Sequence, residues 1–359
     1  MRILRPVFRA LVSGILLAFI LQSPVSAASG FFENGWTLQK DASSLRFQSV
    51  KNLTVVESSG FAEFSGAIDE SGAASVRVFL DSIDTKIDLR NVRMRFLFFE
   101  TFEFPEAVIT TTIDPTDLED LPQLRRKVIP LTFTLDLHGV SKTLQAEVAV
   151  IYLSDDQVAV SSTAPISVAA ADFGLDGGIT KLEEAAGVAI VPSATVSFDF
   201  VFSRNAGTDG SQTVASTETA PQQQRAAGTA LEPEGDFDPE ACKGRFEILS
   251  RTDNIYFPSG SASLEARSAP LLNSLVGIIS RCPGLVIEVG GHTDSDGSET
   301  SNLRLSERRA AAVKQYLVSR DIPDDRIRSV GYGESRPVAP NTSAEGKRRN
   351  RRIEFVVVE

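Results

Sequence analysis

The 359-residue chain is poor in the side chains on which most catalytic and metal sites depend. It has only two Cys and two His, and no Cys/His cluster, which excludes a zinc-type site. No activated Ser or Cys nucleophile and no pair of carboxylates at acid–base spacing stands out. We therefore predict a protein that is not an enzyme and that needs no metal or cofactor. The apolar run near the N-terminus is also shorter than the about 20 residues that a transmembrane helix needs.

That N-terminal run has the pattern of a secretory signal. Three arginines precede an apolar stretch over residues 11–21, and residues 25–27 read Val-Ser-Ala, which is typical of a cleavage site. We predict a signal peptide over residues 1–27, cleaved near Ala27, and export of the rest of the chain. The alternative is an uncleaved anchor. No Cys follows the apolar stretch, which argues against a lipid-anchored lipoprotein.

The two cysteines, Cys242 and Cys282, lie in the last third of the chain. In an exported protein such a pair predicts a disulfide. The loop that this bond closes has about 40 residues, which corresponds to roughly 4 kcal/mol of stabilisation. The alternative is two unrelated buried thiols.

Charge is spread unevenly over the chain, whose net charge is −11. From Cys242 onward there are 18 Lys and Arg against 15 Asp and Glu, a balance of +3, so the preceding residues together have −14. This acidity argues against nucleic acid and anionic lipid head groups as partners of the first part. The weakly basic last part suits an anionic or zwitterionic polymer.

Residues 31–204 alternate between apolar and polar side chains with a period of two, which predicts β-strands. The clearest runs cover residues 76–80, 129–137, 144–152 and 196–202, with turn signals between them. We predict an all-β domain that forms a closed barrel or a sandwich. Most of the 22 Phe residues lie in this part. Five of them, which form either an ordinary core or the wall of a lipid cavity, are Phe96, Phe98, Phe99, Phe102 and Phe104.

The composition changes at residue 205. Residues 205–240 are rich in Gly, Ser, Thr, Ala, Gln and Pro, which predicts a disordered linker. Helical and strand patterns alternate over residues 241–359, which predicts a small α/β sandwich. We expect helices at residues 262–281 and 299–320. We expect strands at residues 246–257, 285–290, 327–333 and 353–358.

Within the second helix, two polar residues share a stripe with core-type side chains. At 100° per residue, Asn302 and Arg309 fall on one face, whereas Arg304 and Arg308 fall outside it. Because Arg is rarely buried without a partner, Arg309 needs an anion. Asp294, just past the strand at residues 285–290, is within reach. The pair predicts either a zwitterionic ligand or a plain salt bridge. The apolar members of the stripe are Leu305, Val313 and Tyr316.

Residues 242–359 contain five motifs that carry a family resemblance. They are Phe257-x-x-x-Ser261-x-x-Leu264, Gly291-His292-Thr293-Asp294, Asn302-x-x-Leu305-Ser306-x-x-Arg309-Ala310-x-x-Val313, Gly331-Tyr332-Gly333-Glu334-x-x-Pro337 and Asn350-Arg351-Arg352-Ile353-Glu354-Phe355. In these motifs the segment resembles the OmpA-like peptidoglycan-binding domain. The resemblance implies noncovalent binding of diaminopimelate in the peptide stem of peptidoglycan. It further implies that Asp294 holds the free ammonium and Arg309 the carboxylate, with Asn302, Arg351 and Arg352 at the rim.

The first part also contains a series of motifs that carry a family resemblance. They are Gly35-Trp36-Thr37-Leu38, Ser44-Leu45-Arg46-Phe47, Phe64-Ser65-Gly66-x-Ile68-Asp69, Ser82-Ile83-Asp84-Thr85, Phe98-Phe99-Glu100, Phe104-Pro105 and Leu137-His138-Gly139-Val140-Ser141-Lys142. In these motifs the first part resembles the YceI-like family. This resemblance implies an eight-stranded, lipocalin-like antiparallel barrel that binds a polyisoprenoid or another long apolar molecule, with the Phe-rich segment 96–104 as a candidate cavity wall.

The chain departs from the YceI-like pattern at positions that concern the polar end of a ligand. The family's His near the first strand is replaced by Ser43-Ser44, and its Arg-Asp-x-His run is absent from residues 89–95. Three arginines occupy that second segment instead. Arg90, Arg93 and Arg95 are either cations at the cavity mouth that bind a phosphate or acid head group, or solvated charges on a strand.

Together these features predict a non-catalytic periplasmic protein in two domains. We expect a YceI-like barrel over residues 31–204, a linker over 205–240 and a peptidoglycan-binding domain over 241–359. The expected partners are peptidoglycan and an isoprenoid or fatty ligand, with no nucleic acid, at or near the outer membrane. The alternative is an outer-membrane protein whose N-terminal half is a transmembrane β-barrel anchored to peptidoglycan.

Overall fold

A computed structural model describes residues 30–206, 235–252 and 255–358 of the chain. The predicted signal peptide and most of the predicted linker lie outside the described residues. The two folded parts on either side of that linker are described separately. No helix in the described ranges is long and apolar enough to cross a membrane.

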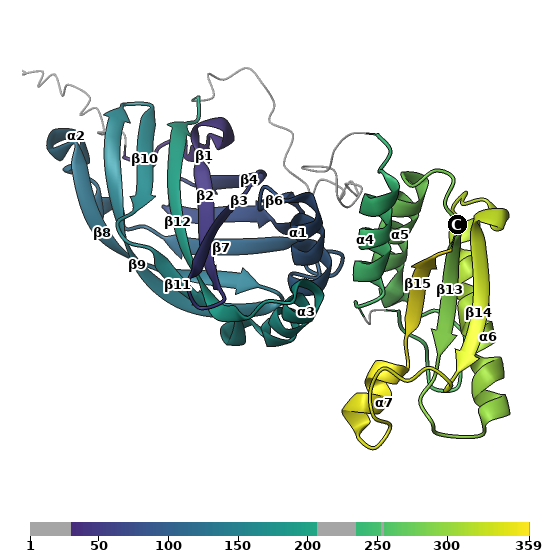
Figure 1. The fold of residues 1–359 in the computed structure, drawn as a ribbon. Helices are drawn as coiled ribbons and strands as arrows, with labels where there is room; N and C mark the ends of the chain where they lie inside the picture. Colours follow the sequence, from purple (N-terminus) through teal and green to yellow (C-terminus); the bar gives the residue numbers. More distant parts are fainter. Residues whose placement is uncertain (1–29, 207–234, 253–254, 359) are drawn as a thin grey trace, which may run out of the picture. The chain divides into compact units, whose positions relative to one another are not determined.

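The first part is a closed antiparallel barrel (Figure 1). Its twelve strand segments form eight barrel strands. Four of these strands consist of two consecutive segments that run along the same neighbouring strand: β1 and β2, β3 and β4, β5 and β6, and β10 and β11. β1 pairs with both β4 and β12 and thereby closes the ring. The segments are β1 (Trp36–Leu38), β2 (Ser44–Lys51), β3 (Val55–Phe61), β4 (Phe64–Ile68), β5 (Ala73–Phe79), β6 (Ile83–Asp84), β7 (Glu106–Thr112), β8 (Arg126–Leu137), β9 (Val140–Ser154), β10 (Gln157–Ser162), β11 (Ile166–Ala169) and β12 (Ile190–Arg204). The predicted eight-stranded barrel is therefore confirmed.

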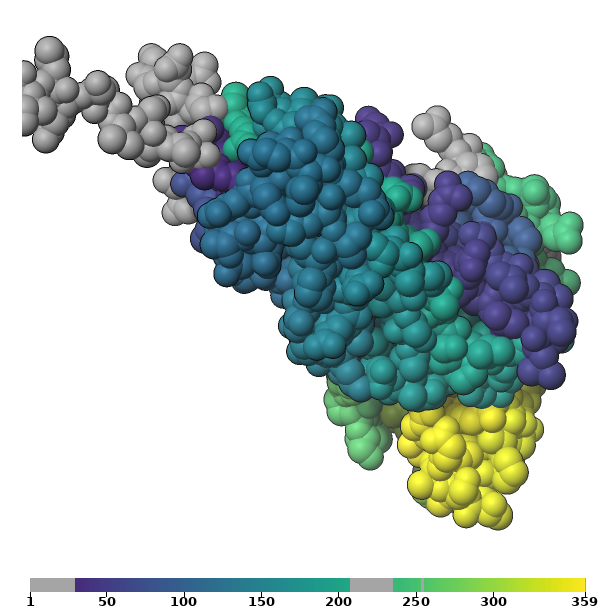
Figure 2. Space-filling model, turned by 90° about the vertical axis from the view of Figure 1, so that its left-hand side faces the viewer, coloured from purple at the N-terminus to yellow at the C-terminus, as the bar shows by residue number. Residues whose placement is uncertain are grey.

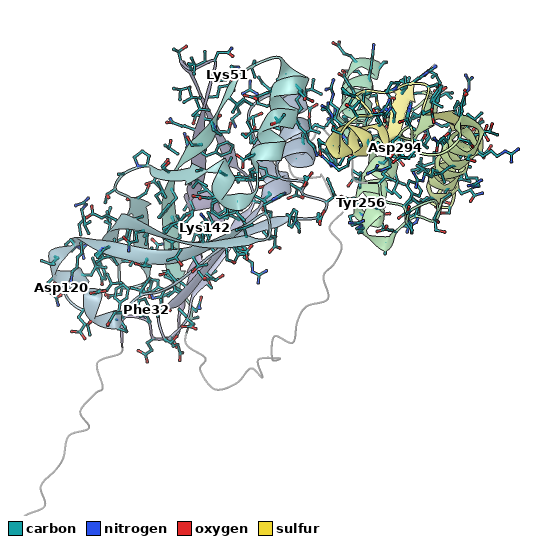
Figure 3. All side chains as sticks on the ribbon, turned by 90° about the horizontal axis from the view of Figure 1, so that it is seen from below. Phe32, Lys51, Asp120, Lys142, Tyr256 and Asp294 are labelled. Atoms are coloured by element: carbon teal, nitrogen blue, oxygen red, sulfur yellow. A yellow bond between two sulfur atoms is a disulfide. The ribbon has the colours of Figure 1, made fainter. Side chains whose placement is uncertain are left out.

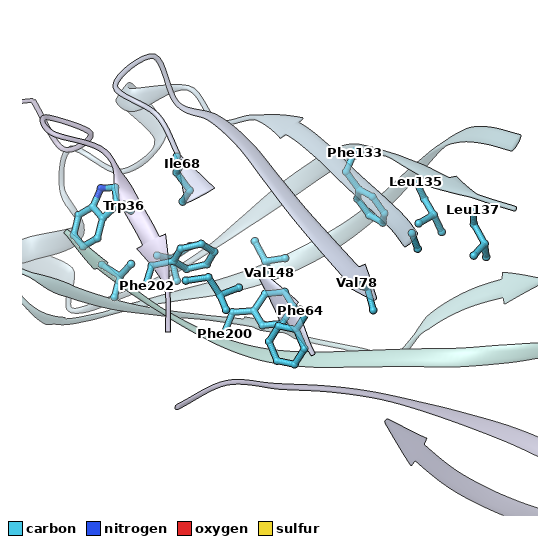
Figure 4. Close-up of a cluster of buried hydrophobic side chains, with 14 of the residues drawn as sticks. Trp36, Phe64, Ile68, Val78, Phe133, Leu135, Leu137, Val148, Phe200 and Phe202 are labelled. Atoms are coloured by element: carbon cyan, nitrogen blue, oxygen red, sulfur yellow. The ribbon is translucent and has the colours of Figure 1, made fainter. Parts of the chain in front are cut away.

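Alternation along the strands directs apolar side chains to the barrel interior. In β8, Phe133 and Leu135 are buried whereas Thr132 and Asp136 are exposed, as expected for a strand with one face on a core. Interior side chains of different strands also pack on one another, as Phe64 of β4 does on Phe200 of β12, with ring centroids 5.7 Å apart (Figure 4). Figure 2 shows one outer face of this part, formed largely by segments drawn in blue and teal.

Helical segments interrupt the barrel where the sequence pattern predicted only strands and turns. α1 and α3 lie at one end of the barrel, which we call the α1–α3 end, and α2 lies at the other (Figure 1). The arginines at 90–95 are therefore helical, so they are not strand charges as one reading had them. The helical segments are α1 (Asp88–Arg93), the π-helical turn η3 (Met94–Phe98), α2 (Leu121–Leu124), α3 (Asp176–Ala186), and the 3₁₀ turns η1 (Lys40–Ala42), η2 (Leu80–Ser82), η4 (Pro115–Asp117) and η5 (Ala170–Phe173).

The second part is the predicted α/β sandwich. Its sheet has the order β14-β13-β15, with β13 parallel to β14 and antiparallel to β15. Buried side chains of α5 and α6, among them Leu275 and Val313, form a core with Val289 and Phe355 of the sheet. The elements are α4 (Pro239–Leu249), α5 (Ala269–Ser280), α6 (Glu299–Val318), α7 (Ala344–Asn350), β13 (Ile287–His292), β14 (Ile327–Gly333), β15 (Ile353–Val357), η6 (Ala266–Ser268) and η7 (Asp324–Arg326).

One strand prediction in this part is wrong. Residues 246–249, expected to begin a strand, are the last turn of α4. The Asp238 side chain caps this helix by accepting a hydrogen bond from Ala241 N, and Pro239 occupies its first position.

The predicted disulfide is present. Cys242 in α4 is bonded to Cys282, which lies two residues beyond the end of α5, with their Cα atoms 6.0 Å apart. Both residues are fully buried. The bond therefore ties the first helix of this part to the end of the second.

Candidate binding sites

The first candidate site lies between the end of β13 and the first turns of α6. α6 passes very close to the sheet, because a Cβ on Gly291 would lie 2.3 Å from Ser306 O and one on Gly331 would lie 2.5 Å from Glu307 N. The glycines of the motif thus allow a close approach that no other residue would tolerate. This approach brings the loop after β13 alongside the helix, with Asp294 in that loop (Figure 3).

Asp294 is buried and surrounded by polar partners. Its exposed fraction is 7%. Arg351 Nη1 lies 2.5 Å from Asp294 Oδ2, and Asp296 N donates to Oδ1 at 3.1 Å. Asn302 Nδ2 donates to the backbone oxygen of Asp294 at 3.2 Å and to Glu334 at 2.5 Å. The structure therefore brings together three of the predicted residues, Asp294, Asn302 and Arg351.

Arg309 is buried on the same helix, with an exposed fraction of 8%. Its Nε donates to Ser261 O at 2.9 Å, its Nη2 to Pro258 O at 3.5 Å, and its guanidinium lies 5.0 Å from the centre of the Phe257 ring. Among the described residues, Nη1 has no hydrogen-bond partner and no ion pair joins Arg309 to Asp294. The simple salt bridge that the spacing allowed is thus not formed.

The surroundings of Arg309 lower the pKa of its guanidinium. Burial is the largest cause and the positive charge of Arg351 is the second, while the negative charge of Asp294 opposes the shift. A buried cation with a lowered pKa gains from an added anion. Arg304 and Arg308 are exposed, so the predicted separation of the three arginines on the helix is confirmed.

Arg352, the remaining predicted rim residue, belongs to a neighbouring cluster. Its Nη2 lies 3.1 Å from Glu354, and His292 Nε2 lies 3.1 Å from the same carboxylate. The contact with His292, ahead of the charge of Arg352, lowers the pKa of Glu354 to about 2. The His292 ring also stacks on Tyr332 with centroids 5.1 Å apart. Arg352 and His292 therefore support the base of the loop rather than contact Asp294.

The second candidate site is a cavity of about 510 Å³ inside the barrel. This volume lies within the range of about 300–1,000 Å³ that is usual for small-molecule sites. Almost all of the lining is aliphatic or aromatic and comes from strands all around the ring. Such a cavity suits a largely apolar ligand.

The Phe-rich segment contributes to this cavity only in part. Phe98 and Phe99 line it, whereas Phe96, Phe102 and Phe104 lie outside the lining. Phe96 stacks on Phe102 with centroids 6.3 Å apart, and Phe104 packs on the His138 ring at 4.2 Å. The segment is helical through residue 98, so successive side chains turn by about 100° and cannot all face one wall.

Charged side chains line one end of the cavity. They are Lys51, Glu57, Arg90 and Arg93, whereas Arg95 is not in the lining. Lys51 and Glu57 were not predicted, although the period of two in β2 contains a signal for Lys51. The side chains at positions 45, 47, 49 and 51 all line the cavity, so Lys51 continues an inward-facing series.

Comparisons with known proteins identify both parts. Residues 36–202 match the model of the YceI-like domain, and residues 256–351 match that of the OmpA family. The Escherichia coli protein named probable lipoprotein YiaD is 37% identical over 110 residues, which are 31% of this chain and 50% of that protein. The Mycobacterium tuberculosis protein named peptidoglycan-binding protein ArfA is 40% identical over 103 residues, 29% of this chain and 32% of that protein. This chain thus spans half or less of these relatives.

A solved structure resembles the first part. It is described as a polyisoprenoid binding domain from Saccharophagus degradans implicated in plant cell wall breakdown. Its sequence identity is 31%, its TM-score is 0.44, and the match covers 47% of this chain and 98% of that one.

Proposed function

Because the chain joins a YceI-like domain at residues 36–202 to an OmpA-family domain at residues 256–351, we propose that it is a non-catalytic binding protein of the cell envelope. Its OmpA-family domain binds the peptide stem of peptidoglycan. Its barrel holds an isoprenoid or another long apolar molecule. The proposal of peptidoglycan binding rests on the arrangement of Asp294 and Arg309, which are both buried, oppositely charged and not paired with each other.

This arrangement fits the zwitterionic end of diaminopimelate. The Asp294 carboxylate has acceptor capacity beyond Arg351 and can accept hydrogen bonds from an ammonium. Among the described residues, Nη1 of Arg309 has no hydrogen-bond partner, and Nη2 has only the long contact of 3.5 Å to Pro258 O. These two N–H groups can therefore donate in parallel to a carboxylate. Asn302 holds the loop by its bond to the Asp294 backbone, and Arg351 is half-exposed at the rim. The relative named as peptidoglycan-binding supports the same ligand class.

The apolar cavity supports the second half of the proposal. A filled barrel would need no ligand, but this one has room for a molecule and few polar groups to hold water there. The polarity of the strands also favours this reading over a membrane-spanning barrel. A lipid-facing wall has apolar residues outside, whereas β8 directs Thr132 and Asp136 outward and Phe133 and Leu135 inward.

The proposed location follows from the ligand. Binding to peptidoglycan and the predicted signal peptide both support a periplasmic location, associated with the wall. A Pseudomonas aeruginosa relative named outer membrane porin F, 37% identical over 121 residues, supports proximity to the outer membrane.

Pelleting with purified sacculi tests the wall-binding function. We expect that Asp294→Ala and Arg309→Ala each weaken binding at least tenfold, because each leaves one charge of the ligand without its partner. Arg308→Ala, an exposed arginine next to Arg309 on the same helix, serves as the matched control and should bind like wild type. Free meso-diaminopimelate should release the wild-type protein, and Nα-acetyl-lysine amide, whose only charged group is an ammonium, should not.

If the folded double variant pelleted with sacculi as the wild type does, the wall-binding proposal would be wrong. Circular dichroism of each variant distinguishes lost contacts from lost folding. For the barrel, mass spectrometry of molecules extracted from the full-length protein should detect an apolar ligand. An empty barrel that takes up no long-chain probe would leave only the wall-binding function.

A further inference from the structure

The charged residues of the barrel cavity gather at the α1–α3 end and have an excess of positive charge. The four charged side chains in the lining are three cations and one carboxylate. Lys51 lies at the end of the barrel far from Phe32 and Asp120 (Figure 3). All four side chains come from α1 and from the two strands of the β2–β3 hairpin. The cavity is thus apolar along its length and cationic at one end.

The single carboxylate is already shared by two of the cations. Lys51 Nζ lies 2.5 Å and Arg90 Nη1 lies 3.0 Å from the Glu57 carboxylate. These three side chains are only partly exposed, with exposed fractions of 30%, 27% and 22% for Lys51, Arg90 and Glu57. One unit of negative charge therefore faces two units of positive charge before the third cation is considered.

Arg93 is the third cation, and it has no counter-charge among the described residues. The side chain is half-buried, and its Nε is buried and lacks a hydrogen-bond partner. No ion pair or hydrogen bond joins the Arg93 guanidinium to any residue that the structure describes. Arg cannot lose its proton at physiological pH, so a half-buried guanidinium without a counter-charge costs free energy unless an anion is supplied from outside the chain.

We propose that the barrel takes a single-chain lipid with an anionic head group, a carboxylate or a phosphate, and that Arg93, assisted by Arg90, binds that head at the α1–α3 end. The proposal rests on the proposed apolar ligand and defines its polar end. The apolar walls receive the chain, and the guanidinium, which matches both oxyanions with two parallel N–H donors, receives the head. A neutral head group would leave Arg93 unpaired.

Binding of three C16 probes to the full-length protein tests this inference. The probes are hexadecanoate, hexadecyl phosphate and hexadecan-1-ol, which share a chain and differ in the charge of the head. We expect wild type to bind both anions at least tenfold more tightly than the alcohol. Arg93→Gln, which removes the charge and keeps a polar side chain that can form hydrogen bonds, should abolish most of that preference and leave the affinity for the alcohol unchanged. The double variant Arg90→Gln/Arg93→Gln should abolish the rest.

Arg46→Gln is the matched control. Arg46 is exposed on β2 between two cavity-lining residues but lies outside the lining, so this change should leave all three affinities as in wild type. Equal affinity of wild type for the alcohol and the anions would overturn the anionic-head proposal, as would an equal loss for all three probes in Arg93→Gln. Failure of all three probes to bind would instead overturn the underlying proposal of a lipid-binding barrel. A preference for only one of the two anions would identify the head group as a carboxylate or as a phosphate.

Discussion

Single residues around the proposed peptidoglycan site have one of two roles: some are placed to contact a ligand, and others hold the loop. Arg309 is held by two backbone carbonyls, so its position does not depend on a ligand. Asp294 is held by Arg351 and by backbone donors of its own loop. A site whose charges are positioned before binding loses less conformational entropy when the ligand arrives. The support beneath it, the cluster around Glu354, can be tested separately.

We expect Glu354→Gln to lower stability in a pH-dependent way. The folded pKa of Glu354 is about 2, below its ordinary value of 4.5, so its ionised form favours folding. This contribution is fully present above about pH 4.5 and is lost as the pH falls toward 2. Because the side chain is 38% exposed, solvent screening reduces it to about 1 kcal/mol. Urea unfolding at pH 7 and pH 2.5 measures the difference.

The variant and wild type should differ most at pH 7, and the difference should be several-fold smaller at pH 2.5. Glu307→Gln, an exposed carboxylate on α6, is the control and should change stability little at either pH. A Glu354→Gln difference that is the same at both pH values would contradict an ionic role for this side chain.

At the scale of elements, the β2–β3 turn is fastened to the loop between α3 and β12, beside the charged end of the cavity. Asn52 N donates to Ala189 O at 2.8 Å, and Ala189 N donates to Asn52 Oδ1 at 3.1 Å. Asn52 has a φ of 49°, a conformation that Asn and Gly tolerate best. We expect Asn52→Gly to keep the turn and lose the side-chain bond, which corresponds to about 0.5–1.5 kcal/mol.

Hydrogen exchange measures this local change. The Ala189 amide should exchange about two- to tenfold faster in Asn52→Gly, with little change in the melting temperature of the barrel. Leu53→Gly in the same turn, where the side chain is 81% exposed and φ is 66°, should not accelerate exchange at Ala189. Unchanged exchange in Asn52→Gly would show that the side-chain bond does not hold the two loops together.

The elements that sequence predicted well are those whose local pattern and tertiary environment agree. The barrel strands alternate because one face meets the cavity and the other meets water. Residues 246–249 were misassigned because Phe246, Ile248 and Leu249 fit either period, and the helix start signal at Asp238-Pro239 lay within the predicted linker. The helical turns at residues 88–98 were missed for a similar reason, since their apolar and basic residues also alternate.

The proposed peptidoglycan site likewise contains features that the sequence predicted and contacts that it could not predict. Asn302 and Arg309 were placed on the buried face of α6 from the 100° rotation per residue alone. The partner of Asp294 could not be derived in this way. Arg351 reaches Asp294 because β15 pairs with β13, with Ile353 opposite Gly291, a register that only the folded sheet defines. Arg352, one residue later, faces Glu354 instead.

At the scale of the whole molecule, the two domains differ in what stabilises them. The barrel surrounds a cavity, so part of its interior is free to be filled by a ligand. The OmpA-family domain has a close-packed core and contains both cysteines of the chain, joined to each other. A ligand that fills the cavity should therefore stabilise the barrel, and a reductant that cleaves the disulfide should destabilise the OmpA-family domain.

We expect calorimetry of the full-length chain to show two transitions that respond to different agents. A reductant should lower only the transition of the OmpA-family domain. The 40-residue separation of Cys242 and Cys282 corresponds to about 4 kcal/mol, or a shift of about 10–20 °C for a domain of this size. An anionic C16 lipid at a hundredfold excess over Kd should raise only the barrel transition, by about 2.7 kcal/mol. The Cys242→Ser/Cys282→Ser variant should show the low transition without reductant and no further response to it. One transition that moves with both agents would instead mean that the OmpA-family domain and the barrel unfold as a single unit, and that a ligand of one domain also stabilises the other.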